Sequence, residues 1–475
     1  ALLWTKRYNG TAGGTDYGNS IAVDYLGNVF VTGKTWTSTS NYDVITIKHN
    51  SSGDTVWTRR YNGPRNGSDE GLSICVDLSG NVYVTGKEEG TVGTHGIWEN
   101  YITIKYNSAG TFLWGASYNG PGGDYDAAYS IAVDGSGNVY VTGESGGGSG
   151  GSGLPYQDYA TIKYNSSGVL QWIKRYNGSS NGNDVARQLK IDVSGNVYVT
   201  GKCVQTSSNN DYATIKYNSA GTQMWVAVYT SAISNTDEAN SLAVDRAGNV
   251  YVTGKSYGGA STLYDIATVK YNTSGVQVWV NIFNGLSNSS DEGKAITVDT
   301  SGNSYVTGYS NNITTAQDFQ TIKYNSAGVQ QWEIKYTNSG SAGSSDQAVS
   351  IYADNSGNVY AAGMSALDYA VVKYGVMTGI GNNHNTSPDG FSLEQNYPNP
   401  FNPTTNIQYM IAETGNVELA VYDVNGKEVM TLVNGMNNVG TYNIQVDASG
   451  LSSGVYFYKL VTSSFTDVKK MMLIK

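Results

Sequence analysis

The sequence predicts an all-β protein, a seven-bladed β-propeller with four strands in each blade, followed by a smaller β domain. The phrase SGNVYVTGK at residues 79–87 recurs unchanged at 194–202. Looser copies are spaced 53 to 58 residues apart, and self-similarity at such a fixed period is typical of a propeller or a solenoid. Gly (59 residues) and Tyr (38) are abundant, and only 14% of residues are charged, a composition that favours strands and turns.

Each repeat unit contains four strand-like runs. The seven units are centred on Asn28, Asn81, Asn138, Asn196, Asn249, Asn303 and Asn358. In one unit the runs are SIAVD (130–134), NVYVTG (138–143), YATIKY (159–164) and WIKRYNG (172–178). The D-x-S-G-N phrase between the first two runs predicts a tight hairpin turn, because Gly and Asn adopt positive φ at low cost. Seven units of four strands make a seven-bladed propeller.

The two ends of the repeat region predict how the ring closes. A Gly-x-x-x-Trp phrase precedes the fourth strand of six units and ends at Trp57, Trp114, Trp172, Trp225, Trp279 and Trp332. Trp4 is the seventh such tryptophan, and the last repeat stops at Tyr374 after its third strand. We therefore expect residues 2–9 to pair with 368–374 and complete the seventh blade, which would remove the exposed sheet edges.

These units resemble the SBBP repeat, a seven-bladed propeller family with the phrase IAVD-x-x-GNVYVTG. The resemblance covers residues 1–375. The Asn-Ser-Ser-Gly-x-x-x-Trp phrase is similar to the tryptophan-docking motif of quinoprotein propellers, in which the tryptophan packs one blade against the next. The fold name alone implies little about activity.

A Gly/Asn/Ser-rich linker at 376–390 separates the propeller from residues 391–475. The second region opens with Asn396, Tyr397, Pro398, Asn399, Pro400, Phe401, Asn402 and Pro403. With YDVNGK, GVYFYKL and a terminal Lys, it resembles the type A sorting domain of type IX secretion, an immunoglobulin-like β-sandwich. The resemblance implies that residues 391–475 engage the type IX machinery and that the protein is extracellular or on the bacterial outer surface. The start ALLWTKRYNG fits a mature chain whose leader has been removed.

Composition excludes several function classes. The net charge of −10 and pI near 4.8 argue against a nucleic-acid partner, which requires a basic surface. No run of about 18 apolar residues occurs, so we expect no membrane span. The two cysteines, Cys75 and Cys203, lie in different units, and we expect no bridge between them.

The sequence gives little support for catalysis. The three histidines are His49, His95 and His384, and no Ser/His/Asp set, HExxH, zinc cluster or phosphate loop accompanies them. We therefore predict a protein that is not an enzyme and has no cofactor or bound metal. A bound calcium ion is possible, but no specific motif indicates one. The abundant carboxylates leave a polysaccharide-cleaving pair as an alternative.

Two acidic positions recur in every unit. The first precedes the Gly-Asn turn, where we expect each carboxylate to accept N–H groups of its own hairpin; its members are Asp24, Asp77, Asp134, Asp192, Asp245, Asp299 and Asp354. The second precedes the first strand; its members are Asp16, Asp69, Asp126, Asp184, Asp237, Asp291 and Asp346. The second set could form an acidic ring that holds a cation or a polar ligand. The alternative is seven identical loop caps.

A third polar position lies at the start of the third strand and accompanies a recurring lysine. The acidic position is occupied by Asp43, Asn100, Asp158, Asp211, Asp265, Asp318 and Asp368. The lysines are Lys48, Lys105, Lys163, Lys216, Lys270, Lys323 and Lys373. Such recurrence predicts pairing between strands or between blades.

Binding specificity is expected where the units differ. The loops that follow VTG vary in length, and variable loops on a rigid scaffold commonly form binding surfaces. Six residues of these loops are candidates for stacking on sugars or anchoring a protein: Trp36, Trp98, His95, Tyr156, Tyr257 and Tyr309. The alternative is that they pack against a neighbouring blade.

Together these features predict a secreted or surface-displayed, non-catalytic scaffold. The main hypothesis is that the protein is a structural subunit of an extracellular assembly, such as a fibre, sheath or surface layer, and associates with itself. The alternative is a module that binds glycan or protein through the variable-loop face. A polysaccharide-cleaving enzyme is the third hypothesis.

Overall fold

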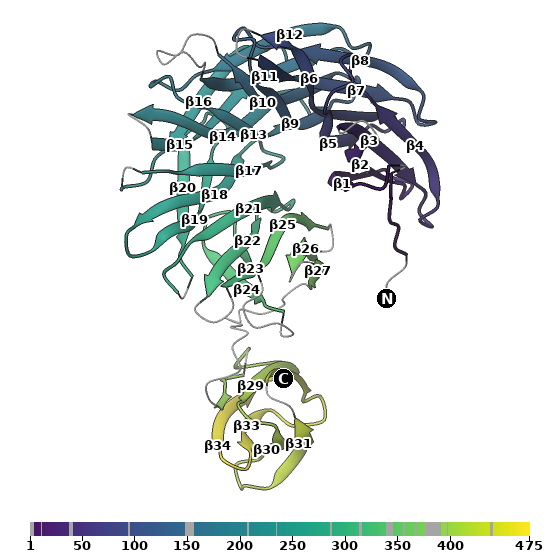
Figure 1. Ribbon diagram of the computed structural model, residues 1–475. Helices are drawn as coiled ribbons and strands as arrows, with labels where there is room; N and C mark the ends of the chain where they lie inside the picture. The colour runs from purple at the N-terminus through teal and green to yellow at the C-terminus, as the bar shows by residue number, and fades with distance from the viewer. Residues whose placement is uncertain are drawn as a thin grey trace. The chain divides into compact units, whose positions relative to one another are not determined.

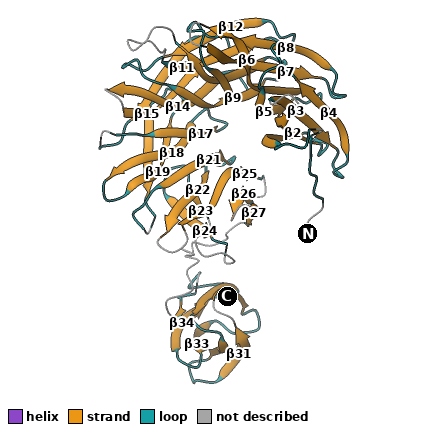
Figure 2. Ribbon diagram, in the orientation of Figure 1, coloured by secondary structure: helices purple, strands orange, loops and turns teal. Residues whose placement is uncertain are grey.

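The computed structural model divides into two units, residues 1–382 and 383–475, which are considered separately. It describes residues 4–10, 12–37, 41–93, 96–147, 156–206, 209–233, 235–285, 287–312, 316–338, 345–354, 357–365, 368–375, 391–396, 398–437 and 440–475. The linker at 376–390 therefore lies outside the described residues. The described part of both units consists of strands and loops (Figure 2). Within it, no helix is long and apolar enough to cross a membrane.

The first unit is a series of antiparallel sheets in which successive strands pair in chain order (Figure 1). Blade 1 contains β1 (Tyr17–Val23), β2 (Val29–Trp36), β3 (Tyr42–His49) and β4 (Thr55–Tyr61). Blade 2 contains β5 (Glu70–Val76), β6 (Val82–Gly93), β7 (Gly96–Tyr106) and β8 (Phe112–Tyr118). Blade 3 contains β9 (Asp126–Val133), β10 (Val139–Gly146), β11 (Gln157–Tyr164) and β12 (Leu170–Tyr176).

The remaining blades follow the same order. Blade 4 contains β13 (Val185–Ile191), β14 (Val197–Thr206), β15 (Asn209–Tyr217) and β16 (Gln223–Tyr229). Blade 5 contains β17 (Glu238–Val244), β18 (Val250–Gly259), β19 (Leu263–Tyr271) and β20 (Gln277–Phe283). Blade 6 contains β21 (Asp291–Val298), β22 (Ser304–Asn312), β23 (Ala316–Tyr324) and β24 (Gln330–Tyr336). The seventh sheet contains β25 (Asp346–Ala353), β26 (Val359–Ser365) and β27 (Asp368–Tyr374).

The repeated Asp of each first hairpin closes the turn, as the sequence predicts. In blade 3, Asp134 accepts hydrogen bonds from the N–H groups of Ser136 and Asn138, both at 2.9 Å. The Asn138 amide and the Tyr140 hydroxyl donate to its other oxygen at 2.8 and 3.0 Å. Burial raises the pKa of Asp134, but these four bonds outweigh it, so its pKa lies below the usual value. Gly137 has φ +78°, a conformation that favours glycine at this turn.

The recurring tryptophans join neighbouring blades. Trp57 of blade 1 donates from Nε1 to the Ser108 carbonyl of blade 2 at 3.2 Å, and its ring lies 6.1 Å from that of Tyr106. Gly110 has φ +79°, and a Cβ there would lie 2.8 Å from the indole. The glycine of Gly-x-x-x-Trp is therefore needed to receive the tryptophan of the preceding blade. This geometry matches the structural role that the tryptophan-docking resemblance implies.

The recurring lysines do not pair with the recurring acidic residues. Lys105 donates to the Ser166 carbonyl of the next blade at 3.1 Å and lies 5.0 Å from the Tyr83 ring centroid. Lys163 and Lys270 make the equivalent bonds to Ser219 and Ser326. The lysine and the acid are five residues apart on one strand, so their side chains leave opposite faces. The lysine therefore connects blades, and the acidic residue finds another partner.

The predicted ring closure is made only in part. Trp4 docks on blade 1 as an interior tryptophan does, with Nε1 3.2 Å from the Ser51 carbonyl and its ring 5.9 Å from His49. However, described residues 4–10 form no strand, and the seventh sheet has three strands with β27 at its edge. Described residues 4–9 therefore do not make the predicted pairing with 368–374. The arc of blades leaves a gap between blade 1 and the seventh sheet (Figure 1).

The second unit is a small β domain built from two sheets. Their strand orders are β28-β29-β32 and β31-β30-β33-β34. The strands are β28 (Ser392–Leu393), β29 (Thr404–Ile411), β30 (Gly415–Tyr422), β31 (Glu428–Asn437), β32 (Gly440–Asp447), β33 (Gly454–Val461) and β34 (Thr466–Leu473). Residues of both sheets, including Ile407 and Tyr409 of β29 and Leu419 and Val421 of β30, share one buried core. This packing is that of a β-sandwich.

The proline-rich motif of the second unit is partly built into this core. The Asn396 side chain is buried and donates to the Pro398 carbonyl and to Thr405 Oγ1 at 3.1 and 3.0 Å. Phe401 is buried, and its N–H donates to the Met472 carbonyl at 2.9 Å. Pro398, Asn399, Pro400 and Asn402 are exposed, Pro403 is half-buried, and Tyr397 lies outside the described residues. The motif thus anchors the start of the domain while presenting a polar and proline-rich surface.

Candidate binding sites at the blade rims

The second set of recurring aspartates caps the loops that connect blades. In blade 3, Asp126 accepts from the Gly120 N–H at 2.8 Å and the Gly146 N–H at 3.1 Å. Asp69, Asp184, Asp237 and Asp291 accept from the equivalent pair of amides, and Asp16 accepts from Gly10 and Trp36. Asp346 accepts from the Asn338 N–H at 2.9 Å. Because these carboxylates are engaged with backbone amides, the geometry favours loop caps over an open acidic ring.

Burial dominates the ionisation of three of the interior caps. It raises the pKa of Asp69, Asp126 and Asp184 to about 6, although the hydrogen bonds from the amides oppose the shift. Asp16 differs because its carboxylate is less buried. There burial raises the pKa, but hydrogen bonds from Gly10, Thr35 and Trp36 outweigh it and hold the pKa below its usual value.

The predicted aromatic residues lie on five different blades. The Trp36 ring is 4.9 Å from Tyr42 and the Tyr257 ring 5.5 Å from Tyr264, each pair within one blade. The Tyr309 hydroxyl donates to Glu292 Oε2 at 2.9 Å. Tyr156 is exposed, and Trp98 Nε1 is buried and bonded to no described residue. His95 lies outside the described residues, and no ring contact within the described part joins two of the six.

A different site recurs where the end of each fourth strand meets the second and third strands of the following blade. We call it the rim groove, and in blade 3 it consists of Tyr118, Ser145, Asp158 and Arg175. Arg175 donates from Nη1 to the Tyr118 hydroxyl at 3.2 Å and to Ser145 Oγ at 2.6 Å. From Nη2 it donates to the Ser145 carbonyl at 2.8 Å and to Asp158 Oδ2 at 2.9 Å. One guanidinium therefore satisfies groups from two blades.

Other rim grooves pair the acidic residue with a cation from the opposite strand. Arg60 lies 3.0 Å from Asp43 in blade 1, and Lys335 lies 3.2 Å from Asp318 in blade 6. Both cations occupy the same position in their blade as Arg175 does in blade 3. In each blade the cation is in register with the residue two positions after the acid; the pairs are Arg60 with Ile45, Arg175 with Ala160 and Lys335 with Gln320. In blades 1, 3 and 6 the third recurring acid is thus the partner of a fourth-strand cation.

Two rim grooves have lost the cation but are filled in another way. In blade 2 the acid is Asn100, and the Tyr61 hydroxyl donates to Glu88 Oε2 at 2.7 Å. In blade 4 Val228 replaces the cation, and the Gln205 side chain donates to the Tyr176 hydroxyl at 2.9 Å and contacts Cys203 Sγ at 3.2 Å. The amide of Gln205 thus contacts two of the positions that the guanidinium contacts in blade 3, whereas Asp211 Oδ1 accepts no hydrogen bond from a described residue.

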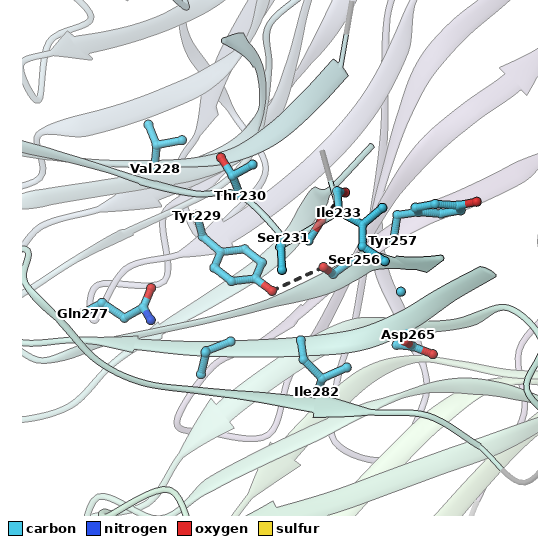
Figure 3. Close-up of a pocket in the computed structure, with 13 residues that line it drawn as sticks. Val228, Tyr229, Thr230, Ser231, Ile233, Ser256, Tyr257, Asp265, Gln277 and Ile282 are labelled. Carbon is cyan, nitrogen blue, oxygen red and sulfur yellow. Dashed lines mark hydrogen bonds between the residues drawn. The ribbon is translucent and has the colours of Figure 1, made fainter. Parts of the chain in front are cut away.

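The rim groove of blade 5 contains a cavity of about 650 Å³. Ile282 stands where the cation would be, and Tyr229, Ser256 and Asp265 line the space around it (Figure 3). The Asp265 side chain belongs to a residue that is 3% exposed, and its Oδ1 accepts no hydrogen bond from a described residue. Thr262 donates to Oδ2 at 3.2 Å. Burial raises the pKa of Asp265 to about 6, and the nearby charge of Asp291 acts in the same direction.

Exposed aliphatic side chains line part of this cavity, together with the polar side chains of Thr230, Ser231 and Gln277. Val280 and Ile282 of β20, Val228 of β16 and Ile233 of the loop after β16 all line it and are exposed. Tyr257, one of the predicted ligand-binding residues, also lines it. The site therefore combines an exposed aliphatic surface with a buried carboxylate.

Sequence reasoning placed Asp265 only within a repeating set and missed this site. The available signal was the residue type at one position of the fourth strand, which is Arg, Arg and Lys in blades 1, 3 and 6 but Ile in blade 5. No group of three or more His, Cys, Asp or Glu side chains in the described part of the chain is arranged to hold a metal ion.

Comparison with protein-family models identifies both regions. A β-propeller repeat matches residues 3–38, 118–150, 227–259 and 278–313. A secretion system C-terminal sorting domain matches residues 395–475. No curated relative matches the sequence.

Solved structures with similar folds share little sequence with this chain. The polysaccharide lyase Uly1 is 12% identical over 78% of this chain and 93% of its own, with a TM-score of 0.45. The NanB sialidase from Streptococcus pneumoniae is 12% identical over 79% and 70%, with a TM-score of 0.39. The β-propeller domain of the Trilobed protease from Pyrococcus furiosus is 7% identical over 69% and 94%, with a TM-score of 0.34.

Proposed function

We propose that this chain, a secreted β-propeller protein with a C-terminal type IX sorting domain, is a non-catalytic structural subunit of an extracellular assembly. Its sorting domain directs it through the secretion machinery to the cell surface or the medium. The propeller is then the part that associates with other copies of the chain in the assembly.

The observation that carries the proposal is that the recurring polar residues are occupied by the architecture. The turn aspartates close hairpins, as Asp134 does with four donors. The cap aspartates hold backbone amides, as Asp126 does. The lysines bond the next blade, as Lys105 does. A series of blades whose polar side chains stabilise one another suits a building block.

Exposed apolar side chains on the outer strands of blades 4 and 5 supply a surface for association. Met224 and Val228 lie on β16, and Val278 and Val280 lie on β20; all four are exposed. Contiguous exposed apolar surface on a soluble domain commonly marks a contact with another protein. We therefore place a subunit contact on the outer strands of these two blades.

The test is the size of the purified full chain, measured by light scattering and negative-stain electron microscopy. We expect regular oligomers or polymers. Met224→Glu combined with Val278→Glu should dissociate them, because the two substitutions place charges on the proposed contact surface. Leu78→Glu, at an exposed apolar turn residue of blade 2, is the matched control and should leave them intact. Discrete monomers of the unaltered protein at all concentrations would refute the assembly.

A ligand-binding module is the second candidate, and the cavity beside Tyr257 favours it. A glycan array tests this function with the unaltered protein, Tyr257→Ala and Trp36→Ala. Binding that is lost with Tyr257→Ala would support a glycan site on the rim, whereas equal binding by both variants would remove aromatic stacking as its basis. In the same experiment we expect no release of reducing or unsaturated ends from the polysaccharides, as a non-catalytic protein requires.

A further inference from the structure

The rim grooves of blades 3 and 5 are built on the same backbone and differ in one key side chain. In blade 3, Asp158 is in register with Ser145, and Ala160 with Arg175. In blade 5, Asp265 is in register with Ser256, and Ala267 with Ile282. Ile282 therefore stands at the position from which Arg175 reaches its acceptors.

The acceptors of that arginine are all retained in blade 5. Tyr229 corresponds to Tyr118 by register. Tyr229 pairs with Tyr212 and Tyr118 with Tyr101, and each of these partners directly follows the third recurring polar position. The Tyr229 hydroxyl lies 3.3 Å from Ser256 Oγ, whereas in blade 3 both equivalent groups accept from Arg175. Three side chains that bind a guanidinium in blade 3 thus recur in blade 5 without one.

The space for a guanidinium is also present. Ile282 ends well short of the length of an arginine, and Gly258 stands where Gln205 fills the groove of blade 4. A Cβ at Gly258 would lie 2.1 Å from Asp265 Oδ2, so glycine keeps this approach open. The resulting cavity of about 650 Å³ ends at Asp265, whose Oδ1 is buried and accepts no bond from the described residues.

We propose that the rim groove of blade 5 binds a guanidinium group on an aliphatic chain, such as an arginine side chain presented by a partner. Asp265 neutralises the charge, and the Tyr229 hydroxyl and Ser256 accept the remaining N–H groups, as their counterparts do for Arg175. A buried carboxylate is costly when unpaired, and a planar guanidinium with several donors in a fixed fork satisfies it together with its neighbours.

The aliphatic part of the ligand has its own surface. Val280, Ile282 and Val228 line the mouth of the cavity, and Ile282 is 49% exposed. The methylene groups of an arginine can cover these side chains while its charged end reaches Asp265. A positive charge alone would not use all the groups of this site. In blade 6 the ammonium of Lys335 pairs with the acid, whereas in blade 3 a guanidinium bridges Tyr118, Ser145 and Asp158.

This inference does not require the assembly proposed above, because a monomeric propeller would contain the same groove, and the two proposals share only Val228 and Val280. The first experiment measures binding of N-acetyl-arginine amide to the full chain by calorimetry at neutral pH. N-acetyl-citrulline amide, which has nearly the same shape without the charge, and N-acetyl-lysine amide are the comparison ligands. We expect one site per chain, citrulline binding at least about tenfold weaker, and loss of about tenfold or more in arginine affinity with Asp265→Asn.

The second experiment exchanges the two grooves. Ile282→Arg should fill the blade 5 groove from within the chain, abolish binding of the ligand and raise the melting temperature. Arg175→Ile should empty the blade 3 groove and give a second site, and Arg175→Ile combined with Ile282→Arg should return one site. Absence of binding to the unaltered chain, or unchanged affinity in both Asp265→Asn and Ile282→Arg, would overturn the proposal. The Ile282→Arg variant removes no buried group, so it keeps the test decisive if Arg175→Ile does not fold.

Discussion

The same residue types lie at the interfaces between interior blades and at the two open ends of the arc. They are buried between interior blades and exposed at the ends. Ile74 of blade 2 is 6% exposed because blade 1 covers it, whereas its counterpart Ile21 of blade 1 is 65% exposed. Tyr159 of blade 3 is 1% exposed and donates to the Ala213 carbonyl of blade 4 at 3.3 Å. Its counterpart Tyr369 in the seventh sheet is 98% exposed.

Each repeat unit therefore carries the side chains for a neighbour on both sides. A cavity of about 440 Å³ is lined by Tyr369 together with Ile45 and Lys6, so the two ends of the arc face one another across it. Ile45 carries the carbonyl that corresponds to that of Ala213. We therefore expect the ends to pack together in solution, with the Tyr369 hydroxyl donating to Ile45 as Tyr159 donates to Ala213.

The largest effects are expected from the two tyrosines. Tyr159→Ala should lower the free energy of unfolding by about 3–5 kcal/mol, because it removes a buried aromatic ring and leaves a cavity. We expect Tyr369→Ala to cost a similar amount when the ends meet. Urea unfolding followed by tryptophan fluorescence measures both. A cost below about 0.5 kcal/mol for Tyr369→Ala, the value typical of an exposed side chain, would show that the arc stays open.

The docking tryptophans are expected to give the next largest effects. Trp57→Ala should cost about 3 kcal/mol, since Trp57 is buried and bonded to Ser108. Trp4→Ala should cost about 2 kcal/mol, because Trp4 makes the same bond to Ser51 but is less buried. The same denaturation measurement applies. No loss of stability with Trp4→Ala would contradict the docking of residues 4–10 on blade 1.

The cap aspartates should respond to pH in opposite directions at the two kinds of position. Burial raises the pKa of Asp126 to about 6, so its contribution to stability is present below about pH 4 and is lost as the pH rises to about 6. Asp16 has a lowered pKa because hydrogen bonds outweigh burial, so its contribution is present above about pH 4 and is lost as the pH falls further.

Melting temperatures of the unaltered protein, Asp126→Asn and Asp16→Asn from pH 3 to 7 measure this contrast. The advantage of the unaltered protein over Asp126→Asn should shrink between pH 4 and 6, whereas its advantage over Asp16→Asn should not shrink there. Parallel curves for all three proteins would contradict the assignment of these shifts.

The smallest expected effect concerns a serine that bonds to the next blade. Ser130 Oγ accepts from the Leu189 N–H of blade 4 at 3.1 Å. Ser130→Ala should therefore cost about 1 kcal/mol, because it leaves a buried N–H without an acceptor. Ser350 is the exposed counterpart of Ser130 in the seventh sheet. If the two ends of the arc pack together, Ser350 would accept a hydrogen bond from the Ile21 N–H of blade 1. Hydrogen exchange at Ile21 that is faster in Ser350→Ala than in the unaltered protein would demonstrate this bond; identical exchange would refute it.

The local parts of the fold could be predicted from the sequence because their causes are local. Asp134, Gly137 and Asn138 define a turn by their own hydrogen bonds and φ values, and the turn recurs in all seven units. The candidate site could not be found in this way. Asp265 occupies a position that is also Asp in five of the other six units, and its lack of a cationic partner depends on Ile282, which lies 17 residues later on another strand.

The repeat, its four strands, the docking role of the tryptophans and the separate sorting domain could all be predicted from the sequence, because periodicity and turn residues encode short-range geometry. The tertiary structure decided which partners the charged residues take: lysines bond the next blade, caps bind loop amides, and Arg175 spans a rim groove. The ends of the arc leave apolar side chains exposed, and blade 5 contains the acceptors that bind a guanidinium in blade 3 without a cation of its own. Both depend on side chains from different strands meeting in space, which no single stretch of sequence specifies.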